Sequence, residues 1–307
     1  MSNRHLQGLI PATHTPFNDD GSLNLQTVEK QAAHLAANGA DTVFIGGSTG
    51  ESHSLTHEER IKLATRWLEI AKGSSLRVIV HVGGNCLEDV KALSAHAGKN
   101  GAHAISALAP CYFKPQNVDA LVDWCAAIAA SAPALPFYFY DIPVLTGVNL
   151  PMVDFLEKGS ARIPNLAGIK YTSLDLVQYQ QCRLVQNGRF DLPWGVDETL
   201  ISAMALGATS AVGSTYNFAM PLYKALLDAV KRGDSAAALE AQTRSLRLVM
   251  ALARHGYMGS AKALMGWLGV PLGPARLPNK TPTASQLTTL RAELEEIGYC
   301  EWGHKLP

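Results

Sequence analysis

The chain has 307 residues, 47% of them hydrophobic, with 26 basic and 26 acidic side chains. This length suits two ordinary domains, or one (β/α)8 barrel of about 250 residues with an extension. The charges balance and form no basic block or stripe, which argues against nucleic acid and anionic membranes as partners.

The five cysteines are scattered and contain no CxxC pair, which is typical of free thiols in a reducing compartment. Residues 1–7 have no apolar signal core. The apolar stretch 120–140 resembles a membrane span, but Asp123, Pro133 and Pro136 interrupt it, and a helix, a turn and a strand explain it better. We therefore expect a soluble, cytoplasmic protein.

Short apolar, β-favouring runs alternate with longer amphipathic runs along most of the chain. The strand-like runs are residues 8–13, 41–46, 76–81, 102–107, 137–140, 166–170, 190–195 and 210–213. Helical patterns lie between them, and one of these helices opens at Thr56 with Glu59 three residues later, the spacing of a capping box. About eight such units predict a parallel α/β fold, a (β/α)8 TIM barrel.

Beyond the eighth unit the patterns are helical only, most clearly at residues 236–254 and 283–297. No linker is long enough to separate an independent domain. We therefore predict a barrel over residues 1–220 and a C-terminal helical extension over residues 221–307, packed together as one structural unit.

The strand-like run 166–170 ends in Lys170, and hydroxyl residues follow directly. A buried ammonium is costly unless it is paired or loses its charge. A neutral amine is a nucleophile that forms Schiff bases with carbonyl substrates. The structural alternatives are that Lys170 extends to solvent or pairs with a carboxylate, and this segment alone does not decide between them.

Barrel enzymes build their sites at the C-terminal ends of the strands. The residues that follow the predicted strands are Ser48, Thr49, Tyr112, Tyr140, Thr172, Gly195, Asp197, Glu198 and Ser214. No His, Cys or carboxylate pattern has metal-ligand spacing and no phosphate-binding motif occurs, so we expect neither metal nor cofactor. The amine of Lys170 is thus the one reactive group to which the sequence pattern points.

Each of these residues also has a structural explanation. Ser48 and Thr49 are ordinary turn residues, and Tyr140 suits a core position with its hydroxyl bonded. Asp197 and Glu198 stand where the first turn of a helix favours acids. We further expect Glu51 to support its turn, and His81, at the end of a strand, to be a structural histidine.

Four segments, in order and at matching spacing, resemble one known family. They are Gly46-Gly-Ser-Thr-Gly-Glu51, Tyr140-Asp-Ile-Pro143 with Thr146-Gly-Val148, Gly168-Ile-Lys-Tyr-Thr-Ser173, and Gly213-Ser-Thr-Tyr-Asn217. The family is the pyruvate-dependent class I aldolases, the superfamily of N-acetylneuraminate lyase and dihydrodipicolinate synthase, and the resemblance runs from about Leu6 to Pro278.

Within that superfamily the chain is more similar to the lyase branch. Gly195-Val-Asp-Glu198 resembles the lyase motif that holds the hydroxylated tail of sialic acid. The synthase branch typically carries an arginine that clamps a second carboxylate, and this chain has Leu145 at that position.

The resemblance implies reversible cleavage of N-acetylneuraminate to N-acetylmannosamine and pyruvate through an imine on Lys170, with Tyr140 relaying protons. Ser48 and Thr49 would hold the substrate carboxylate, and Thr172 would orient Lys170 and contact substrate. The remaining sugar-binding residues implied are Gly195, Asp197, Glu198 and Ser214. Members of the superfamily commonly form tetramers, and Tyr112 resembles a tyrosine that some members lend to a neighbouring subunit, so a homotetramer is expected.

Two other functions stay open. A related pyruvate-dependent aldolase acting on a 2-keto-3-deoxy sugar acid would share Lys170, Tyr140 and the turn at Ser48, and differ in what Asp197 and Glu198 contact. A non-catalytic sugar-acid binding protein on the same barrel is the second. Cleavage of 2-keto-3-deoxygluconate tests the first alternative, and borohydride trapping with pyruvate tests the second.

Overall fold

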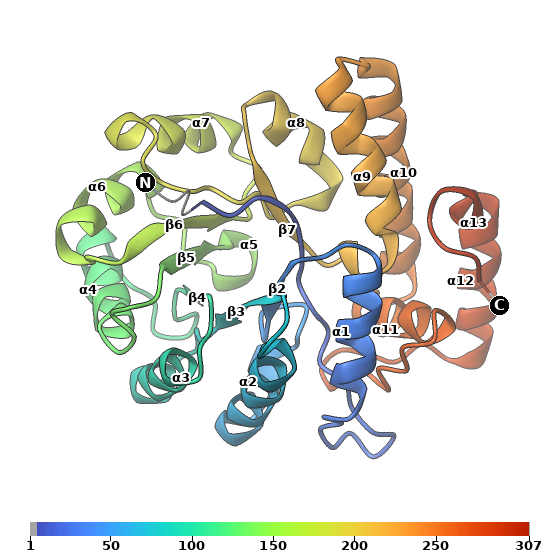
Figure 1. Ribbon diagram of the computed structural model, residues 1–307, viewed down its shortest axis with the longest axis horizontal. Coiled ribbons are helices and arrows are strands. Elements are labelled where there is room, and N and C mark those ends of the chain that lie inside the picture. Colours follow the sequence, from blue (N-terminus) through green and yellow to red (C-terminus); the bar gives the residue numbers. More distant parts are fainter. Residues whose placement is uncertain (1–4, 307) are drawn as a thin grey trace.

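The computed structural model describes residues 5–306, and strands and helices alternate through most of it (Figure 1). The strands are β1 (Gly8–Pro11), β2 (Thr42–Ile45), β3 (Arg77–His81), β4 (Ala104–Leu108), β5 (Phe137–Asp141), β6 (Leu166–Tyr171) and β7 (Ser210–Gly213). The helices of the barrel part are α1 (Thr27–Ala37), η1 (Ser52–Ser54), α2 (His57–Ala71), α3 (Leu87–Lys99), α4 (Val118–Ala129), α5 (Pro143–Thr146), α6 (Met152–Arg162), α7 (Leu176–Leu184), η2 (Val185–Asn187), η3 (Asp197–Thr199), α8 (Leu200–Ala205) and α9 (Tyr216–Arg232). The later helices are α10 (Ser235–Arg254), α11 (Tyr257–Trp267), α12 (Ala284–Glu296) and α13 (Tyr299–Trp302).

All the strand pairs are parallel, as the alternating pattern predicts. Strands β2 to β6 pair in chain order, and β1 pairs with β7. The backbone N–H of Thr13 donates to the carbonyl of Phe44 at 2.9 Å, which joins the end of β1 to β2. The helices lie around the outside of these strands (Figure 1).

The seventh predicted strand, residues 190–195, is not a continuous strand in the structure. Its backbone still bonds β6 on one side and β7 on the other, through isolated bridges at Asp191 and Trp194. The interruption lies at Pro193, which has no N–H to donate to β6, although its carbonyl accepts from Tyr171 N at 2.9 Å. The segment therefore closes the ring between β6 and β7 with a gap in the ladder.

Buried apolar side chains form two cores. A large outer core lies between the strands and the surrounding helices, and it includes Trp67, Phe139 and Leu226. A smaller cluster with members from β1, β2, β3, β4, β5 and β7 includes Ile79 and Tyr138. Alternation along each strand explains the division, since successive side chains face opposite sides.

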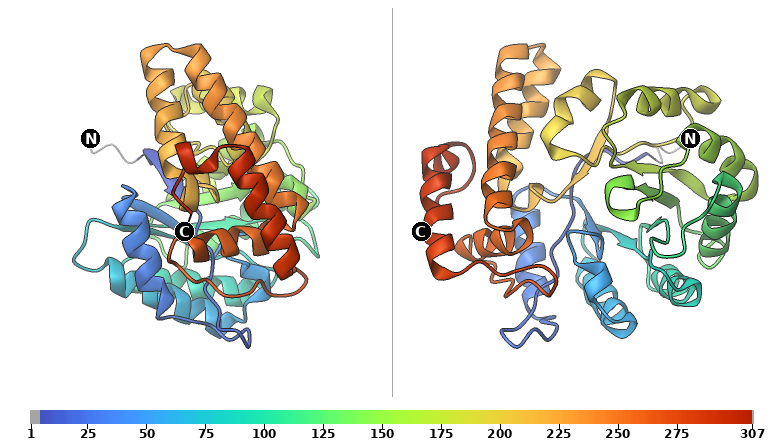
Figure 2. Two further views of the ribbon diagram at one scale, coloured as in Figure 1. Left: turned by 90° about the vertical axis from the view of Figure 1, so that its right-hand side faces the viewer. Right: turned by 180° about the vertical axis from the view of Figure 1, so that it is seen from behind.

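The helices after β7 gather on one side of the barrel (Figure 2). Helix α9 carries residue 220 in its interior, so the boundary that we expect there falls within one helix, and α10 packs against it. The division into barrel and extension remains a proposal. None of the helices described between residues 5 and 306 is long and apolar enough to cross a membrane.

The predicted capping box at the start of α2 is present. The Thr56 hydroxyl accepts from the backbone N–H of Glu59, and the Glu59 carboxylate accepts from the backbone N–H of Thr56. These two bonds satisfy backbone donors that a helix start otherwise leaves without a partner. The cap fixes where the chain enters α2 after the turn at Gly46–Glu51.

Candidate active site

Lys170 stands on β6 directly beside Tyr140 of β5, its partner in the strand register. Its Nζ lies 3.6 Å from the centroid of the Tyr140 ring and 4.6 Å from that of Phe44. The residue is 5% exposed, so it does not extend to solvent. Among the described residues no carboxylate forms an ion pair with Lys170, and its close contacts are aromatic faces, which argues against both structural alternatives for this lysine.

The turn after β2 approaches the same point. Ser48 and Thr49 are half-buried at its tip, and the Ser48 Oγ lies 3.4 Å from the Tyr140 hydroxyl. A side chain at Gly50 would meet the backbone of Gly46 at 3.1 Å and the carbonyl of Thr13 at 3.2 Å. The turn is therefore tightly folded, and Tyr140 connects it to Lys170.

Thr172 and Gly195 meet on the other side of Lys170. A Cβ at Gly195 would lie 1.9 Å from the Thr172 Oγ1, so only glycine allows this approach. The Thr172 backbone N–H donates to the carbonyl of Asp141 at 2.8 Å. Its hydroxyl is buried and has no partner among the described residues, which leaves it free for a substrate group.

Asp197 does not cap the helix that follows it. Its Oδ2 instead accepts from the backbone N–H of Thr215 at 3.0 Å and from the Thr215 hydroxyl, at the start of α9. Its Oδ1 is buried without a partner in the described chain and lies against Gly213. Burial raises the pKa of Asp197, although the bonds from Thr215 oppose the rise.

Glu198 is half-buried next to Asp197. Burial raises the pKa of its carboxyl, and the charge of Asp197 adds to the rise. Two adjacent acids that are partly shielded from water are costly unless they bind polar partners. The two carboxyl groups therefore offer hydrogen-bond acceptors for hydroxyl groups.

A cavity of about 390 Å³ opens over the turn and the helical extension. Its described lining includes Ser48, Thr49, Leu145 and Tyr257 and no Arg, and it touches the site at the turn, since Lys170, Tyr140 and Asp197 are not among the lining residues. The Tyr257 hydroxyl lies 2.6 Å from the Ser214 Oγ, which ties the predicted sugar-binding serine to α11. Tyr257 is not among the residues predicted from the sequence, because nothing in the local pattern of this helix distinguishes it from a core aromatic.

Three other predicted residues lie as follows. Tyr112 is 78% exposed, packs against the Phe113 ring and does not line the cavity of its own chain. His81 is buried, its Nδ1 lies 2.9 Å from the Gly46 carbonyl, and burial lowers its pKa well below the usual range. Its Nε2 has no partner among the described residues, so its bonding is satisfied on one side only. Glu51 supports the turn, as expected, through contacts described below.

In residues 5–306 no group of three His, Cys, Asp or Glu side chains is arranged to hold a metal ion. The described site thus consists of one amine, several hydroxyls and an acid pair. Such a set can form an imine, move protons and bind hydroxyl groups. Acid–base and covalent chemistry is what these side chains supply.

The family model of the dihydrodipicolinate synthetase family matches residues 5–297. The chain belongs to this family. Relatives described as N-acetylneuraminate lyase include that of Rattus norvegicus, which is 38% identical over 300 residues, 96% of this chain and 94% of the rat protein. The Homo sapiens lyase is 36% identical over 301 residues, 96% of this chain and 94% of the human protein.

Solved structures of similar proteins also include N-acetylneuraminate lyases. The N-acetylneuraminate lyase (sialic acid aldolase) of Aliivibrio salmonicida has a TM-score of 0.94 and 39% identity, with 98% of this chain and 99% of that chain covered. The Proteus mirabilis lyase has a TM-score of 0.93 and 37% identity over 96% of this chain and 99% of that chain. These likenesses confirm the predicted TIM barrel and the predicted resemblance to pyruvate-dependent aldolases of the lyase type.

Proposed function

We propose that this chain is a Schiff-base aldolase that reversibly cleaves N-acetylneuraminate to N-acetylmannosamine and pyruvate. One observation carries the chemistry: the buried Lys170 amine lies 3.6 Å from the Tyr140 ring centroid, and the Tyr140 hydroxyl lies 3.4 Å from Ser48. A nucleophilic amine, a proton-carrying phenol and a hydroxyl-bearing turn are thus neighbours. The similarity to the lyases named above favours N-acetylneuraminate as the substrate.

The reaction uses Lys170 as nucleophile. Its amine attacks the C2 ketone of the open-chain sugar acid, and loss of water gives an iminium ion. The iminium accepts the electron pair of the C3–C4 bond as the C4 hydroxyl gives up its proton, which releases N-acetylmannosamine. The pyruvate enamine that remains takes a proton at C3, and water hydrolyses it from Lys170. Tyr140 suits a proton relay between these steps, because a phenol both donates and accepts.

Ser48 and Thr49, with the backbone N–H groups of their turn, would bind the substrate carboxylate. The unpartnered oxygens of Thr172 and Asp197 would bind sugar hydroxyls, together with Gly195, Glu198 and Ser214. The buried polar atoms would disfavour substrates that lack those hydroxyls. Leu145 lines the cavity where a synthase-type arginine would stand, which argues against a second substrate carboxylate.

We also propose that the chain works as a cytoplasmic homotetramer. The large apolar side chains of Tyr112 and Phe113, on the loop after β4, and of Val144 and Leu145, in helix α5, are exposed. Exposed apolar side chains are typical of subunit contacts, and a contact through the loop after β4 would carry Tyr112 toward a neighbour's site. All five cysteines are unpaired, which suits a reducing compartment. Light scattering of the pure protein tests the tetramer.

The decisive experiment is borohydride reduction in the presence of pyruvate, read by intact mass and peptide mapping. We expect a stable adduct on Lys170 in the wild type and none in Lys170→Ala. Lys224→Ala, which removes an exposed lysine, is the matched control and should keep the adduct. A folded wild type without an adduct would exclude the Schiff-base reaction and favour a binding protein. Faster cleavage of 2-keto-3-deoxygluconate than of N-acetylneuraminate would favour the related aldolase.

A further inference from the structure

Glu51 ends the turn that carries Ser48 and Thr49, and its backbone is unusual. It has φ +54 and ψ 36, the left-handed region that non-glycine residues rarely adopt. Its backbone N–H donates to the carbonyl of Ser48 at 3.0 Å, so this conformation shapes the turn directly. A strained residue persists only where its surroundings hold it in place.

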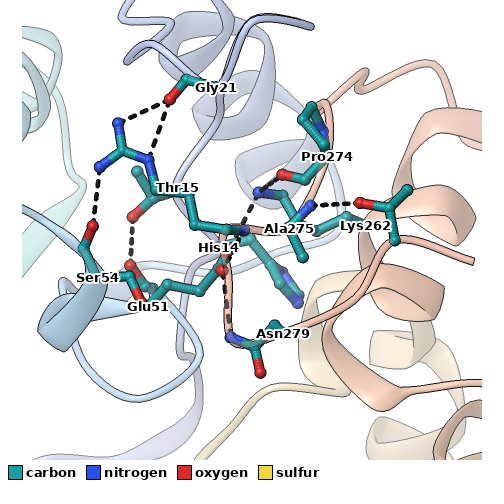
Figure 3. A network of polar contacts seen from close by, with 12 residues as sticks. His14, Thr15, Gly21, Glu51, Ser54, Lys262, Pro274, Ala275 and Asn279 are labelled. Carbon is teal, nitrogen blue, oxygen red and sulfur yellow. Dashed lines mark hydrogen bonds and ion pairs between the residues drawn. The ribbon is translucent and has the colours of Figure 1, made fainter.

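The residues that hold Glu51 come from the far end of the chain. Its Oε1 accepts from the Lys262 Nζ at 3.1 Å. Its Oε2 accepts from the backbone N–H of Arg276 at 2.8 Å and from the Asn279 amide at 3.3 Å. Figure 3 shows Glu51 and Asn279 bonded to each other, with Lys262 nearby. In the described part of the chain, the hydrogen-bond partners of this carboxylate come from α11 and the loop that follows it.

The Lys262–Glu51 ion pair is fully buried, with both side chains at 0% exposure. The Lys262 Nζ also donates to the carbonyl of Pro274 at 2.6 Å and lies 4.1 Å from the Phe17 ring centroid. Burial lowers the pKa of Lys262 to about 8, and the charge of Glu51 opposes the fall, so the ammonium persists at neutral pH. A buried ion pair adds little net stability compared with apolar residues, so stability does not explain this one.

The extension also holds the segment just after the turn. The Arg276 guanidinium donates to the carbonyls of Ser54 and Gly21 and forms an ion pair with Glu59, the N3 residue of the α2 capping box. From the barrel side, the Thr15 hydroxyl donates to the carbonyl of Gly50 at 2.6 Å. The turn is thus held between the segment that follows β1 and the helical extension.

We propose that Lys262 and Glu51 form a positioning pair, through which the helical extension sets the backbone of the substrate-carboxylate turn. Glu51 borders the cavity, but both of its carboxylate oxygens are already bonded, and Lys262 is not among the lining residues, so neither side chain binds substrate in this proposal. The pair acts by keeping Glu51 in its left-handed conformation, so that the Ser48 and Thr49 groups converge on one carboxylate. This inference rests on the function proposed above, in which that carboxylate belongs to pyruvate.

The test is steady-state kinetics of the condensation reaction with Lys262→Met. We expect the KM for pyruvate to rise about tenfold or more, while the KM for N-acetylmannosamine changes less than about twofold. A loss of folded protein alone would lower the apparent kcat and leave both KM values unchanged. Arg254→Met is the matched control. It breaks an ion pair with Glu293 inside the extension, and neither of these residues contacts the turn.

Lys262→Met leaves the Glu51 charge buried without its partner, which can destabilise the protein. The double variant Glu51→Gln with Lys262→Met removes both charges, and it should recover thermal stability while the pyruvate KM stays high. Unchanged pyruvate KM in the folded variants, or an equal rise for both substrates, overturns the proposal.

Amide hydrogen exchange separates this proposal from the proposed function. Exchange across residues 46–54 should be faster in Lys262→Met than in the wild type and in Arg254→Met, whatever the substrate is. If the wild type forms no pyruvate adduct, the function is wrong while faster exchange still supports the positioning pair. Unchanged exchange in this segment counts against the pair even where the aldolase reaction is confirmed.

Discussion

The Asp197 carboxylate lies so close to Gly213 that a methyl group at position 213 would displace it. A Cβ at Gly213 would lie 1.8 Å from the Asp197 Oδ1 and 2.5 Å from its Cγ, far inside any real contact. In Gly213→Ala the carboxylate must therefore move by about 1 Å or more. It then loses its present bonds to the N–H and hydroxyl of Thr215, and its free oxygen points elsewhere.

The size of the effect follows from those bonds. A hydrogen bond to a charged group contributes about 1.5–3 kcal/mol, and about 1.4 kcal/mol corresponds to a tenfold change in an equilibrium or rate constant. If Asp197 binds a sugar hydroxyl, displacing it should lower kcat/KM for N-acetylneuraminate about 10- to 100-fold. Lys170 and Tyr140 keep their contacts with each other, so borohydride trapping of pyruvate should persist.

The assay is cleavage of N-acetylneuraminate beside pyruvate trapping, on protein shown to be folded by circular dichroism. Gly266→Ala is the matched control, because a Cβ there meets nothing within 4 Å and its helix α11 favours alanine. That control should keep full activity and gain slight stability. Wild-type kcat/KM in a folded Gly213→Ala would refute the assigned role of Asp197. Loss of pyruvate trapping in the folded variant would show that the displacement extends to Lys170.

Two further substitutions test the surroundings of the site. Burial raises the pKa of Asp141 from its ordinary 3.8 to about 7. The contribution of Asp141 to the free energy of unfolding therefore falls as pH rises from about 4 to about 7, by about 4 kcal/mol. In urea denaturation at equal protein concentration, Asp141→Asn should therefore be more stable than wild type at pH 8 and similarly stable at pH 4. Equal stability of the two proteins at both pH values would contradict a raised pKa for the Asp141 carboxyl. Tyr257→Phe removes one neutral hydrogen bond to Ser214 and should raise the KM for N-acetylneuraminate about 3- to 10-fold while pyruvate trapping persists. An unchanged KM would leave Tyr257 as a wall of the cavity only.

Much of the site can be predicted from local patterns in the sequence. The capping box at Thr56 and the strand that carries Lys170 each depend on residues a few positions apart. Both are present in the structure, although the strand ends one residue later, at Tyr171. The period of the hydrophobic pattern decides between helix and strand in the same local way. The sequence by itself therefore determined the alternation of elements and the positions of Lys170 and Tyr140 near the ends of neighbouring parallel strands, and the strand register then places the two side by side.

The seventh strand shows the limit of that approach. The apolar pattern of residues 190–195 predicts a continuous strand, yet Pro193 removes one donor from the ladder with β6. A proline inside an apparent central strand is a signal in the sequence against a continuous strand, because proline has no N–H for the ladder. The segment pairs where expected, but only through the residues on either side of Pro193.

Only the tertiary structure decided which distant residues complete the site. Lys262 and Arg276 reach Glu51 across more than 200 residues of chain, and Tyr257 reaches Ser214 across 43 residues. The helices that carry them have ordinary helical patterns, because periodicity reports which face is buried and not what that face contacts. The packing of the extension against the barrel sets those contacts. It brings Lys262 into contact with Glu51 at the end of the turn, and Tyr257 into the lining of the adjacent cavity.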